Sequence, residues 1–370
     1  MTDDYQVRLD PLPDPDVLRE SWQALEARSA CSVFLRWPWI ESWLAMIGDS
    51  RGDAWLVTVS LAARTVGLGL IVGRRTRNGL GTRGLWLHET GDPVLDNLTV
   101  EYNGLLSESG RESACLQAMI RHLARSGPRW SLLHLPGIPA HHLDMRQLQD
   151  EGLDLQCKES ATPYVDLAAL RKGGQSYLSG LSANNRSAIR RTARRIEQKF
   201  GALSLRLVDG AGARLEAFDR LCDLHQRHWS GRGGGAFADP RIVAFHRRLL
   251  ADPRMQHQLQ LLALMAGERP VGYVYGLIWG GATYFYQAGI DYDAHAGSGS
   301  PGLLMLSLAV QHACDAGQAR YEFMAGDSRY KRALATQADR LVWLTLDRSG
   351  WLLRARRAWR RLKSRGGAAR

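Results

Sequence analysis

The chain has 370 residues and a net charge of +11, and 45% of its residues are hydrophobic and 23% charged. This composition predicts a globular protein with a full core and excludes a disordered chain, and the length suggests about two domains. The sequence contains no apolar run of the roughly 20 residues that a membrane-spanning helix needs. The acidic start Met1-Thr2-Asp3-Asp4 lacks the basic region of a signal peptide, so we expect a cytoplasmic protein.

Most of the positive charge lies at one end of the chain. Residues Trp351–Arg370 contain eight arginines and lysines and no acid, which leaves +3 for the other residues. Nucleic acid is therefore not expected as a partner of the body. The tail also places Leu352, Trp359 and Leu362 on one side of a predicted basic amphipathic helix. Such a helix fits either a peripheral contact with the inner membrane face or packing on the body with a frayed basic end.

The five cysteines are widely spaced and form no C-x-x-C pair. This pattern predicts reduced thiols, with no disulfide framework and no metal site. The motifs G-x-x-x-x-G-K-[ST], G-x-S-x-G and H-E-x-x-H are also absent from the sequence, so P-loop, α/β-hydrolase and zinc-protease functions lose their usual support.

Periodicity and turn residues predict a mixture of helices and strands in the first half. Helices are expected at Asp16–Arg28, Trp37–Ile47, Glu112–Arg125 and His141–Glu151. Strands are expected at Trp55–Ser60, Val66–Val72, Gly84–Leu87 and Trp130–Leu135, with an extended segment at Thr162–Leu167.

The second half repeats this scheme. Helices are expected at Ala183–Phe200, Arg214–Trp229, Pro240–Ala251, Pro301–Ala316 and Tyr330–Ala335. Strands are expected at Leu203–Val208, Gln258–Met265, Val271–Trp279, Thr283–Ala288, Arg320–Met324 and Leu341–Asp347, with hairpin turns at Gly267-Glu268 and Gly280-Gly281. This order predicts a mixed α/β sheet built twice, with units at 1–165 and 166–350 and the basic tail at 351–370.

The segment Asp291–Gly302 joins a predicted strand to a predicted helix through several glycines. Ser300 is a good N-cap residue, and Pro301 suits the first helical position. A glycine-rich turn at a helix N-terminus offers free N–H groups and the positive end of the helix dipole, which suit a pyrophosphate. A flexible loop with a well-formed cap is the alternative.

The predicted helix Ser182–Phe200 carries Arg186, Arg190 and Arg194 at steps of four residues. Such a row repels itself unless an anion faces it, so phosphate, nucleotide and anionic lipid are candidate ligands. A solvated basic face is the alternative interpretation.

Two further groups of residues could take part in proton transfer or in holding an anion. His225 lies one helical turn before His228, and a histidine can act as a general base near neutral pH. Near the end of the chain, Tyr330 could donate a proton and Lys331 could hold a phosphate. Simpler roles are open for both groups: a surface histidine at a helix end, and Asp327 as the cap of a short helix.

Several short motifs occur in an order that resembles a known family. They are Trp37-Pro38-Trp39, Asn185-Arg186, His225 with Arg227 and Trp229, Tyr286-Gln287-Ala288-Gly289, Ser300-Pro301-Gly302, and Tyr321-Glu322-Phe323 followed by Gly326-Asp327 and Tyr330-Lys331. Together they resemble the CelD/BcsL-type acetyltransferases of the GNAT superfamily, which are associated with cellulose and exopolysaccharide biosynthesis. The resemblance implies tandem GNAT-like domains, each with a largely antiparallel twisted sheet flanked by helices, as in the FemAB transferases.

The resemblance also implies the activity and the site. Acetyl-CoA or another acyl-CoA would donate an acyl group to an amine or hydroxyl of a sugar, a polysaccharide precursor or another small acceptor. His225 or Asp291 would act as base and Tyr330 as acid, and backbone N–H groups near Tyr286–Gly289 would polarise the thioester carbonyl. Donor binding is assigned to Gln287, Gly289, Gly297, Gly299, Ser300 and Gly302, and substrate binding to Arg186, Arg190, Trp229, Asp327 and Lys331. The family's phosphate loop begins with Arg or Gln, whereas this chain has Ala294 at that position.

Two other functions remain open. A FemAB-like enzyme would transfer an aminoacyl group from a charged tRNA. A non-catalytic GNAT-fold protein would support exopolysaccharide synthesis at the membrane.

Overall fold

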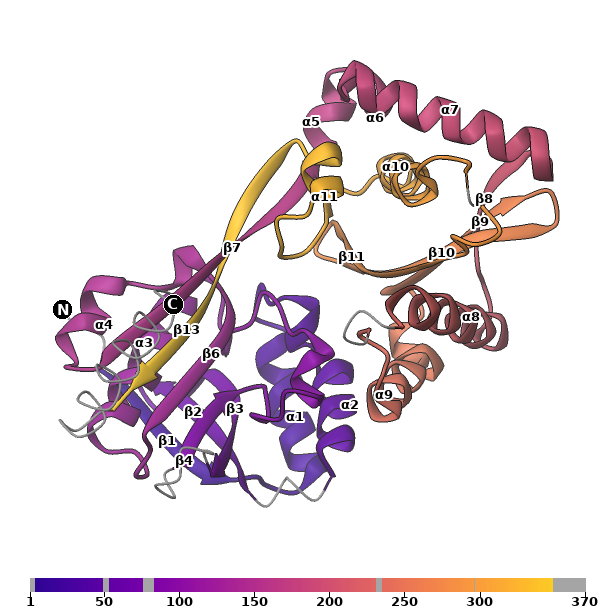
Figure 1. The fold of residues 1–370 in the computed structure, drawn as a ribbon. Helices are drawn as coiled ribbons and strands as arrows, with labels where there is room; N and C mark the ends of the chain where they lie inside the picture. Colours follow the sequence, from indigo (N-terminus) through magenta and orange to yellow (C-terminus); the bar gives the residue numbers. More distant parts are fainter. Residues whose placement is uncertain (1–3, 49–52, 76–82, 231–234, 296, 349–370) are drawn as a thin grey trace, which may run out of the picture.

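The computed structural model describes residues 4–48, 53–75, 83–230, 235–295 and 297–348. Within them, thirteen strands form one sheet in the order β1-β2-β3-β4-β6-β13-β7-β12-β11-β10-β9-β8, and β5 pairs with β3. Figure 1 shows that the sheet runs through two halves, each with its own helices. The fold is thus a mixed α/β architecture with a largely antiparallel sheet flanked by helices, as the sequence predicted.

The first half combines an antiparallel sheet with helices on both faces. Its strands are β1 (Tyr5–Pro11), β2 (Ala54–Leu61), β3 (Arg64–Arg75), β4 (Arg83–Leu87), β5 (Leu106–Ser107) and β6 (Leu132–Pro139). Its helices are α1 (Pro15–Glu26), α2 (Trp37–Ile47), α3 (Glu112–Arg125) and α4 (Met145–Asp150). Strands β1 to β4 are antiparallel neighbours, whereas β6, which follows α3, pairs with β4 in parallel.

The second half repeats this plan. Its strands are β8 (Leu203–Leu207), β9 (Leu259–Ala266), β10 (Arg269–Trp279), β11 (Ala282–Ile290) and β12 (Arg320–Glu322). Its helices are α5 (Leu167–Lys172), α6 (Tyr177–Gly180), α7 (Ala183–Phe200), α8 (Ala211–Trp229), α9 (Pro240–Ala251), α10 (Pro301–Asp315) and α11 (Arg329–Leu334). Strands β8 to β11 are antiparallel, and β12, which follows α10, pairs with β11 in parallel.

The last strand of each half pairs with a strand of the other half. β7 (Asp154–Asp166) pairs with β12, and β13 (Gln337–Asp347) pairs with β6. β7 and β13 also pair with each other over all eleven residues of β13. Figure 1 shows this ribbon crossing between the halves. The predicted unit boundary at 165/166 falls at the end of β7, but β13, which the sequence grouped with the second unit, lies beside β6.

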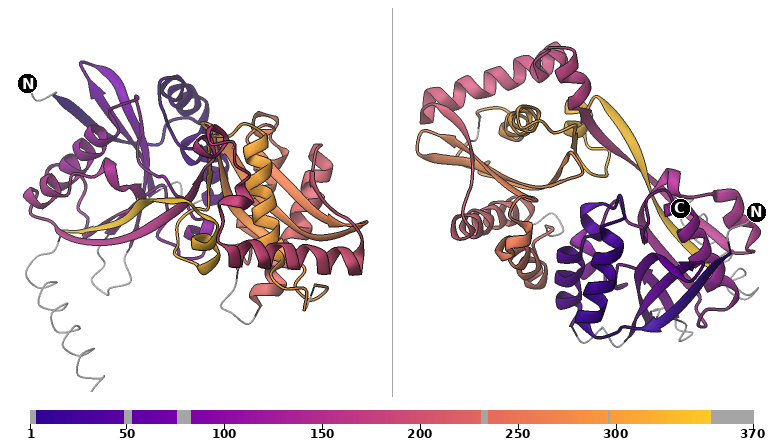
Figure 2. Two further views of the ribbon diagram at one scale, coloured as in Figure 1. Left: turned by 90° about the horizontal axis from the view of Figure 1, so that it is seen from above. Right: turned by 180° about the vertical axis from the view of Figure 1, so that it is seen from behind.

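Helices cover both faces of the sheet in the second half. α7 and α10 lie on one face and α8 and α9 on the other, as Figure 1 and the right view of Figure 2 show. α2 of the first half packs against α9, and Trp39 of α2 has its ring 4.8 Å from that of Phe245. The largest buried cluster therefore contains residues of both halves.

The local signals in the sequence explain the helix bounds. α7 begins after Ser182, whose hydroxyl accepts a hydrogen bond from the Asn185 N–H, and ends at Gly201, which has φ +102°. Gly280 and Gly281 both have positive φ in the β10–β11 hairpin, as the predicted turn requires. No helix in the described residues is long and apolar enough to cross a membrane. The predicted tail, 351–370, lies outside the described residues.

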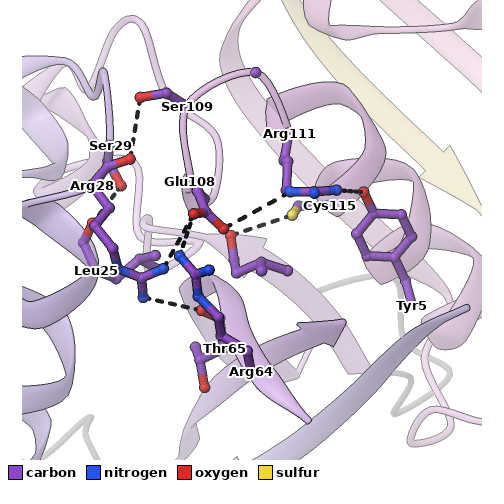
Figure 3. A network of polar contacts seen from close by, with 12 residues as sticks. Tyr5, Leu25, Arg28, Ser29, Arg64, Thr65, Glu108, Ser109, Arg111 and Cys115 are labelled. Carbon is purple, nitrogen blue, oxygen red and sulfur yellow. Dashed lines mark hydrogen bonds and ion pairs between the residues drawn. The ribbon is translucent and has the colours of Figure 1, made fainter. Parts of the chain in front are cut away.

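The Glu108 carboxylate forms ion pairs with three arginines from different elements of the first half. The Glu108 side chain, 22% exposed, pairs with Arg28 at 3.4 Å, with Arg64, and with Arg111 at 3.8 Å (Figure 3). Arg28 follows α1, Arg64 begins β3 and Arg111 precedes α3. One side chain thus connects three elements.

Glu108→Gln is expected to lower the free energy of unfolding by about 1–2 kcal/mol, because three guanidinium groups lose a partly buried counter-charge. Urea unfolding measures this change. Glu159→Gln is the matched control, since its pair with Arg340 is more than half exposed on both sides; its effect should stay within about 0.5 kcal/mol. Equal effects of the two substitutions would contradict the structural role of Glu108.

Candidate functional site

The parallel strands β11 and β12 diverge soon after they meet. They pair only over Ala282–Tyr284 and Arg320–Glu322, although β11 continues to Ile290. Beyond Tyr284, no strand of the described residues neighbours this edge of β11, although the Ala288 N–H donates to Gln287 Oε1 at 3.3 Å and the Ala288 carbonyl accepts from His225. A β-bulge at Tyr286 adds a bend at the same point, since the pairing with β10 passes from Gln287 directly to Phe285.

A cavity of about 770 Å³ lies at this divergence. Its wall comes from β11, α7, α8, α10 and α11, from the turn after β12, and from Thr99 and Glu101 of the first half. Of the residues that the sequence assigned to the site, the structure brings together Trp229, His225, Gln287, Gly299, Ser300, Gly302, Tyr330 and Lys331. A cavity of this size, apolar with a few convergent polar groups, is typical of a small-molecule site.

The N-terminus of α10 opens into the cavity at Gly299, Ser300, Gly302 and Leu303. Ser300 is the N-cap residue and Pro301 begins the helix, as predicted, but the Ser300 side chain forms no capping hydrogen bond and the first turn holds no acid. The Ser300 N–H is used, because it donates to Thr192 Oγ1 at 3.1 Å. The anion-binding capacity of this turn therefore lies with the N–H groups of Gly302 and Leu303.

Glu101 is a buried acid in the cavity wall, although it comes from the first half. Its side chain is 3% exposed and accepts a hydrogen bond from the Ala325 N–H at 2.6 Å. Burial raises the pKa of Glu101 to about 7, although the Ala325 hydrogen bond and the Lys331 charge oppose this rise. A carboxyl group with this pKa can both accept and release a proton near neutral pH.

Glu322 is a second buried acid near Glu101. It accepts a hydrogen bond from Tyr102 Oη at 2.9 Å and pairs with Arg320 at 2.9 Å. Burial raises the pKa of Glu322 to about 7, while Arg320 and Tyr102 counteract the shift. Its charge also raises the pKa of Glu101, so protonation of the two acids is coupled.

Lys331 supports the turn that follows β12. Its ammonium group donates to the carbonyl groups of Met324 at 3.1 Å and Ala325 at 2.5 Å. Met324 has φ +64°, a strained value for a residue other than glycine. Burial lowers the pKa of Lys331 and the Glu101 charge raises it. Lys331 thus stabilises this strained turn through two hydrogen bonds. Its predicted contact with an anionic part of a substrate stays a prediction.

Tyr330 lies beside Lys331 on α11 and lines the cavity. Burial raises the pKa of Tyr330 to about 12. Its phenol therefore keeps its proton at neutral pH, as a proton donor must. Trp229, 40% exposed, also lines the cavity.

His225 reaches the cavity wall, but the backbone occupies both of its ring nitrogens. Nδ1 lies 3.2 Å from the Ala288 carbonyl oxygen, which can only accept, so Nδ1 carries the hydrogen. Nε2 then accepts the Ala236 N–H at 3.3 Å. Burial lowers the pKa of His225. Both ring nitrogens thus have backbone partners in this structure, and the role of His225 as a base stays a prediction.

The remaining predicted residues do not line the cavity. The Asp291 carboxylate accepts the Ala294 N–H at 3.0 Å, within its own turn. A Cβ atom on Gly289 would meet the Leu221 carbonyl oxygen at 2.4 Å, so this glycine allows β11 to pack on α8.

Gly297, Asp327, Arg186 and Arg190 also lie outside the cavity wall. The Gly297 carbonyl accepts from Arg195 at 3.3 Å, and Asp327 pairs with Arg332 at 2.8 Å. Arg186 donates to the carbonyl groups of Ser179 and Leu181, and Arg190 is exposed on α7. The contacts of Gly297, Asp327 and Arg186 are thus made within the chain.

Sequence reasoning missed Glu101 and Tyr102, because residues 88–105 received no predicted element. One sequence feature could have drawn attention to them: Glu101 is the single acid in the otherwise apolar and neutral stretch Leu98–Leu106. An acid among apolar residues is buried with a partner or has a function.

In the first half, the parallel strands β4 and β6 correspond to β11 and β12 of the second half. Here the segment 98–104 fills the space between the two strands. The Asn103 N–H donates to the Gly137 carbonyl at 2.9 Å, and a Cβ atom on Gly137 would meet the Val100 oxygen at 2.8 Å. His88 bonds Asn103 at 2.8 Å between these strands. The segment that closes this slot also delivers Glu101 to the cavity of the second half.

The architecture is thus a mixed α/β fold with a ligand-sized cavity where two parallel strands diverge. Residues 183–332, which supply most of the cavity wall, match the family model described as "Acetyltransferase (GNAT) domain". This part of the chain is therefore similar to GNAT acetyltransferase domains. No curated protein sequence is significantly similar to the chain.

Solved structures share the fold over nearly the whole chain. FemX aligns with a TM-score of 0.56 and 9% identity, covering 90% of this chain and 96% of that one. A conserved protein of unknown function from Bacteroides thetaiotaomicron VPI-5482 gives 0.53 and 10%, with 93% and 100% covered. The C-terminal domain of a putative lysylphosphatidylglycerol synthetase from Agrobacterium fabrum gives 0.52 and 10%, with 89% and 90% covered. At these identities, the likeness shows the fold alone.

The raised pKa of Glu101 makes a prediction about stability. Its folded-state pKa, about 7, lies above the reference value of 4.5, so the folded protein binds more protons between these values, and stability falls as pH rises through this window. Glu101→Gln removes this titration. Compared with the wild type, the variant should gain about 1–3 kcal/mol between about pH 5 and about pH 8 in urea unfolding. Parallel pH profiles for both proteins would contradict a buried, titrating Glu101.

Proposed function

We propose that this protein is an acyltransferase that moves an acetyl or longer acyl group from acyl-CoA to an amine or hydroxyl of a small acceptor. The observation that carries this proposal is the joint position of three features in one cavity. They are the free edge of β11, the uncapped N-terminus of α10 and the buried Glu101 carboxyl group. The match of residues 183–332 to the GNAT domain model supports the same reaction class.

The diphosphate and the thioester of the donor can be placed at successive positions along β11. At one end, Ile290 lies next to Gly302, because a Cβ atom on Gly302 would meet Ile290 Cδ1 at 3.0 Å. The donor diphosphate fits here, on the N–H groups that begin α10. Tyr286 lies four residues back, about 13 Å away for an extended strand. The acyl thioester would lie near this end, where the free strand edge could donate to its carbonyl.

Glu101 and Tyr330 are the groups that fit proton transfer. Glu101, with a pKa near 7, would take the proton from the acceptor as its nitrogen or oxygen attacks the thioester carbonyl. Tyr330, with its raised pKa, would protonate the departing CoA thiolate. The base thus comes from the first half and the donor site from the second. Glu101 takes the place of His225 and Asp291 in the scheme drawn from the sequence.

The motifs of the chain support a placement among CelD/BcsL-type enzymes, which implies a saccharide acceptor from exopolysaccharide or cellulose synthesis and a cytoplasmic site of action. The Glu101 carboxyl group in the cavity wall suits an amino sugar as well as a sugar hydroxyl. The FemAB-like alternative and the scaffold alternative stay predictions, because the likeness to FemX concerns the fold alone.

Donor binding is testable with one helix-start substitution and a matched control. Gly302→Asp places a carboxylate where the diphosphate would bind, whereas Gly212→Asp places one in the first turn of α8, in open space. Both positions favour an acid through the helix dipole. Acetyl-CoA should raise the melting temperature of the wild type and of Gly212→Asp, since only native protein binds it, but not that of Gly302→Asp.

The full ligand-induced shift in Gly302→Asp would contradict donor binding at α10. The lack of any shift in the wild type with CoA, acetyl-CoA and longer acyl-CoAs would contradict the acyltransferase proposal as a whole.

The role of Glu101 is testable by kinetics. CoA release is followed with a thiol reagent against a panel of amino sugars and neutral saccharides. Glu101→Gln should lower kcat by about 10²- to 10⁴-fold and remove the acidic limb of the pH profile, which the wild type should show near pH 7. The acetyl-CoA thermal shift should remain, and the exposed control Glu159→Gln should keep its activity. Unchanged kcat in Glu101→Gln would refute its role as the base.

A further inference from the structure

The outer face of α7 carries an array of cations without counter-charges. The helix holds Arg186, Arg190, Arg191, Arg194, Arg195 and Lys199 against the single acid Glu197. Its buried positions, Ile189, Thr192 and Ile196, face the core. The periodicity therefore turns the arginines to the outside, and Arg190, Arg191, Arg194 and Arg195 are exposed.

These cations form no ion pair in the part of the chain that the structure describes. Arg186 and Arg195 donate only to backbone carbonyl groups, and Lys199 lies 4.9 Å from the Phe200 ring centre. Arginines on other helices behave differently: on α3, Arg121 and Arg125 both pair with Glu151, at 3.3 and 3.1 Å. Like charges at steps of four residues repel one another, so the α7 row costs stability unless an anion covers it.

The charge of the whole chain is concentrated in the same way. α7 has a net charge of +5 and the tail Trp351–Arg370 has +8, so the other residues together carry −2 of the total of +11. The excess positive charge is therefore confined to one surface helix and one terminal segment, where it can act on a partner.

We propose that the outer face of α7 binds the surface of an anionic phospholipid bilayer. The exposed arginines Arg190, Arg191, Arg194 and Arg195 lie opposite the buried positions of α7 and span about 8 Å of the helix, at about 1.5 Å per residue, so they can contact lipid phosphates lying in one plane. α7 lies at the outer side of its half in Figure 1 and in the right view of Figure 2, so the described part of the fold does not obstruct a flat surface there. Arginine also binds phosphate in a bidentate manner.

A nucleic acid fits this face less well. Proteins that bind single strands combine cations with aromatic side chains on which bases stack. The exposed row on α7 contains no aromatic residue, since its single aromatic residue, Phe200, lies at the end of the helix and packs against the core. The inference does not depend on the acyltransferase proposal, because the outer face of α7 is separate from the cavity.

Sedimentation with lipid vesicles tests the proposal on the full chain. The α7 variant is Arg190→Gln/Arg191→Gln/Arg194→Gln, and the matched control, Arg129→Gln/Lys158→Gln/Arg269→Gln, removes the same charge from exposed positions elsewhere. Vesicles contain either phosphatidylcholine alone or phosphatidylcholine with about one third phosphatidylglycerol. The wild type and the control should bind the anionic vesicles, and the α7 variant should bind at least about tenfold more weakly. Binding to neutral vesicles should be weak for all three.

Further measurements make the outcome decisive. An Arg→Lys version of the α7 variant should recover most of the binding, and unchanged melting temperatures exclude unfolding as the cause of a loss. Equal binding by the α7 variant and the wild type would overturn the proposal and assign the membrane contact to the tail. Wild-type binding to an RNA duplex without binding to anionic vesicles would overturn it in favour of nucleic acid.

Discussion

The exchange of final strands between the two halves is the constraint on which the rest of the structure depends. β7 closes the sheet of the second half at β12, and β13 closes the sheet of the first half at β6. Because these two strands also pair with each other over eleven residues, neither half can separate without breaking the longest ladder at their junction. The shared core between α2 and α9 adds a second attachment. Together they hold residues 98–102 of the first half against the turn after β12.

The candidate site depends on that attachment. The Tyr286 hydroxyl donates to the Leu98 carbonyl, Tyr102 donates to Glu322, and Glu101 accepts from Ala325, so three contacts join one short segment to the cavity. Thr99, Tyr102 and Met324 all have positive φ, and strained backbone of this kind persists only where the surroundings enforce it. A buried carboxyl group beside a cavity is also costly unless its partners are fixed. The strand exchange supplies this rigidity.

Local sequence signals were sufficient for the helices and for part of the site. The predicted bounds of Trp37–Ile47, Glu112–Arg125, Ala183–Phe200 and Pro240–Ala251 agree with the structure, because apolar periodicity and capping residues determine where a helix begins and ends. The glycine loop before α10 and the pair Tyr330-Lys331 likewise lie at the cavity. Other features depend on contacts distant in sequence. The strand exchange joins residues 154–166 to 337–347, β1 had no predicted counterpart, and only the folded chain shows that Glu101 meets Ala325.

The two halves share a plan but differ at the helix that follows the diverging strands. α10 begins with no acid in its first turn and no side-chain cap, which leaves N–H groups for an anion. α3, its counterpart, has Glu112 in the first turn, and this carboxylate accepts the Gly110 N–H at 3.1 Å. An acid there repels a phosphate and occupies a donor that would bind it. Residues 98–104 also fill the slot beside β4 and β6, so the first half lacks both features in the described residues, whereas its Glu101 lines the cavity of the second half. With the donor site proposed above, this asymmetry predicts one bound donor per chain.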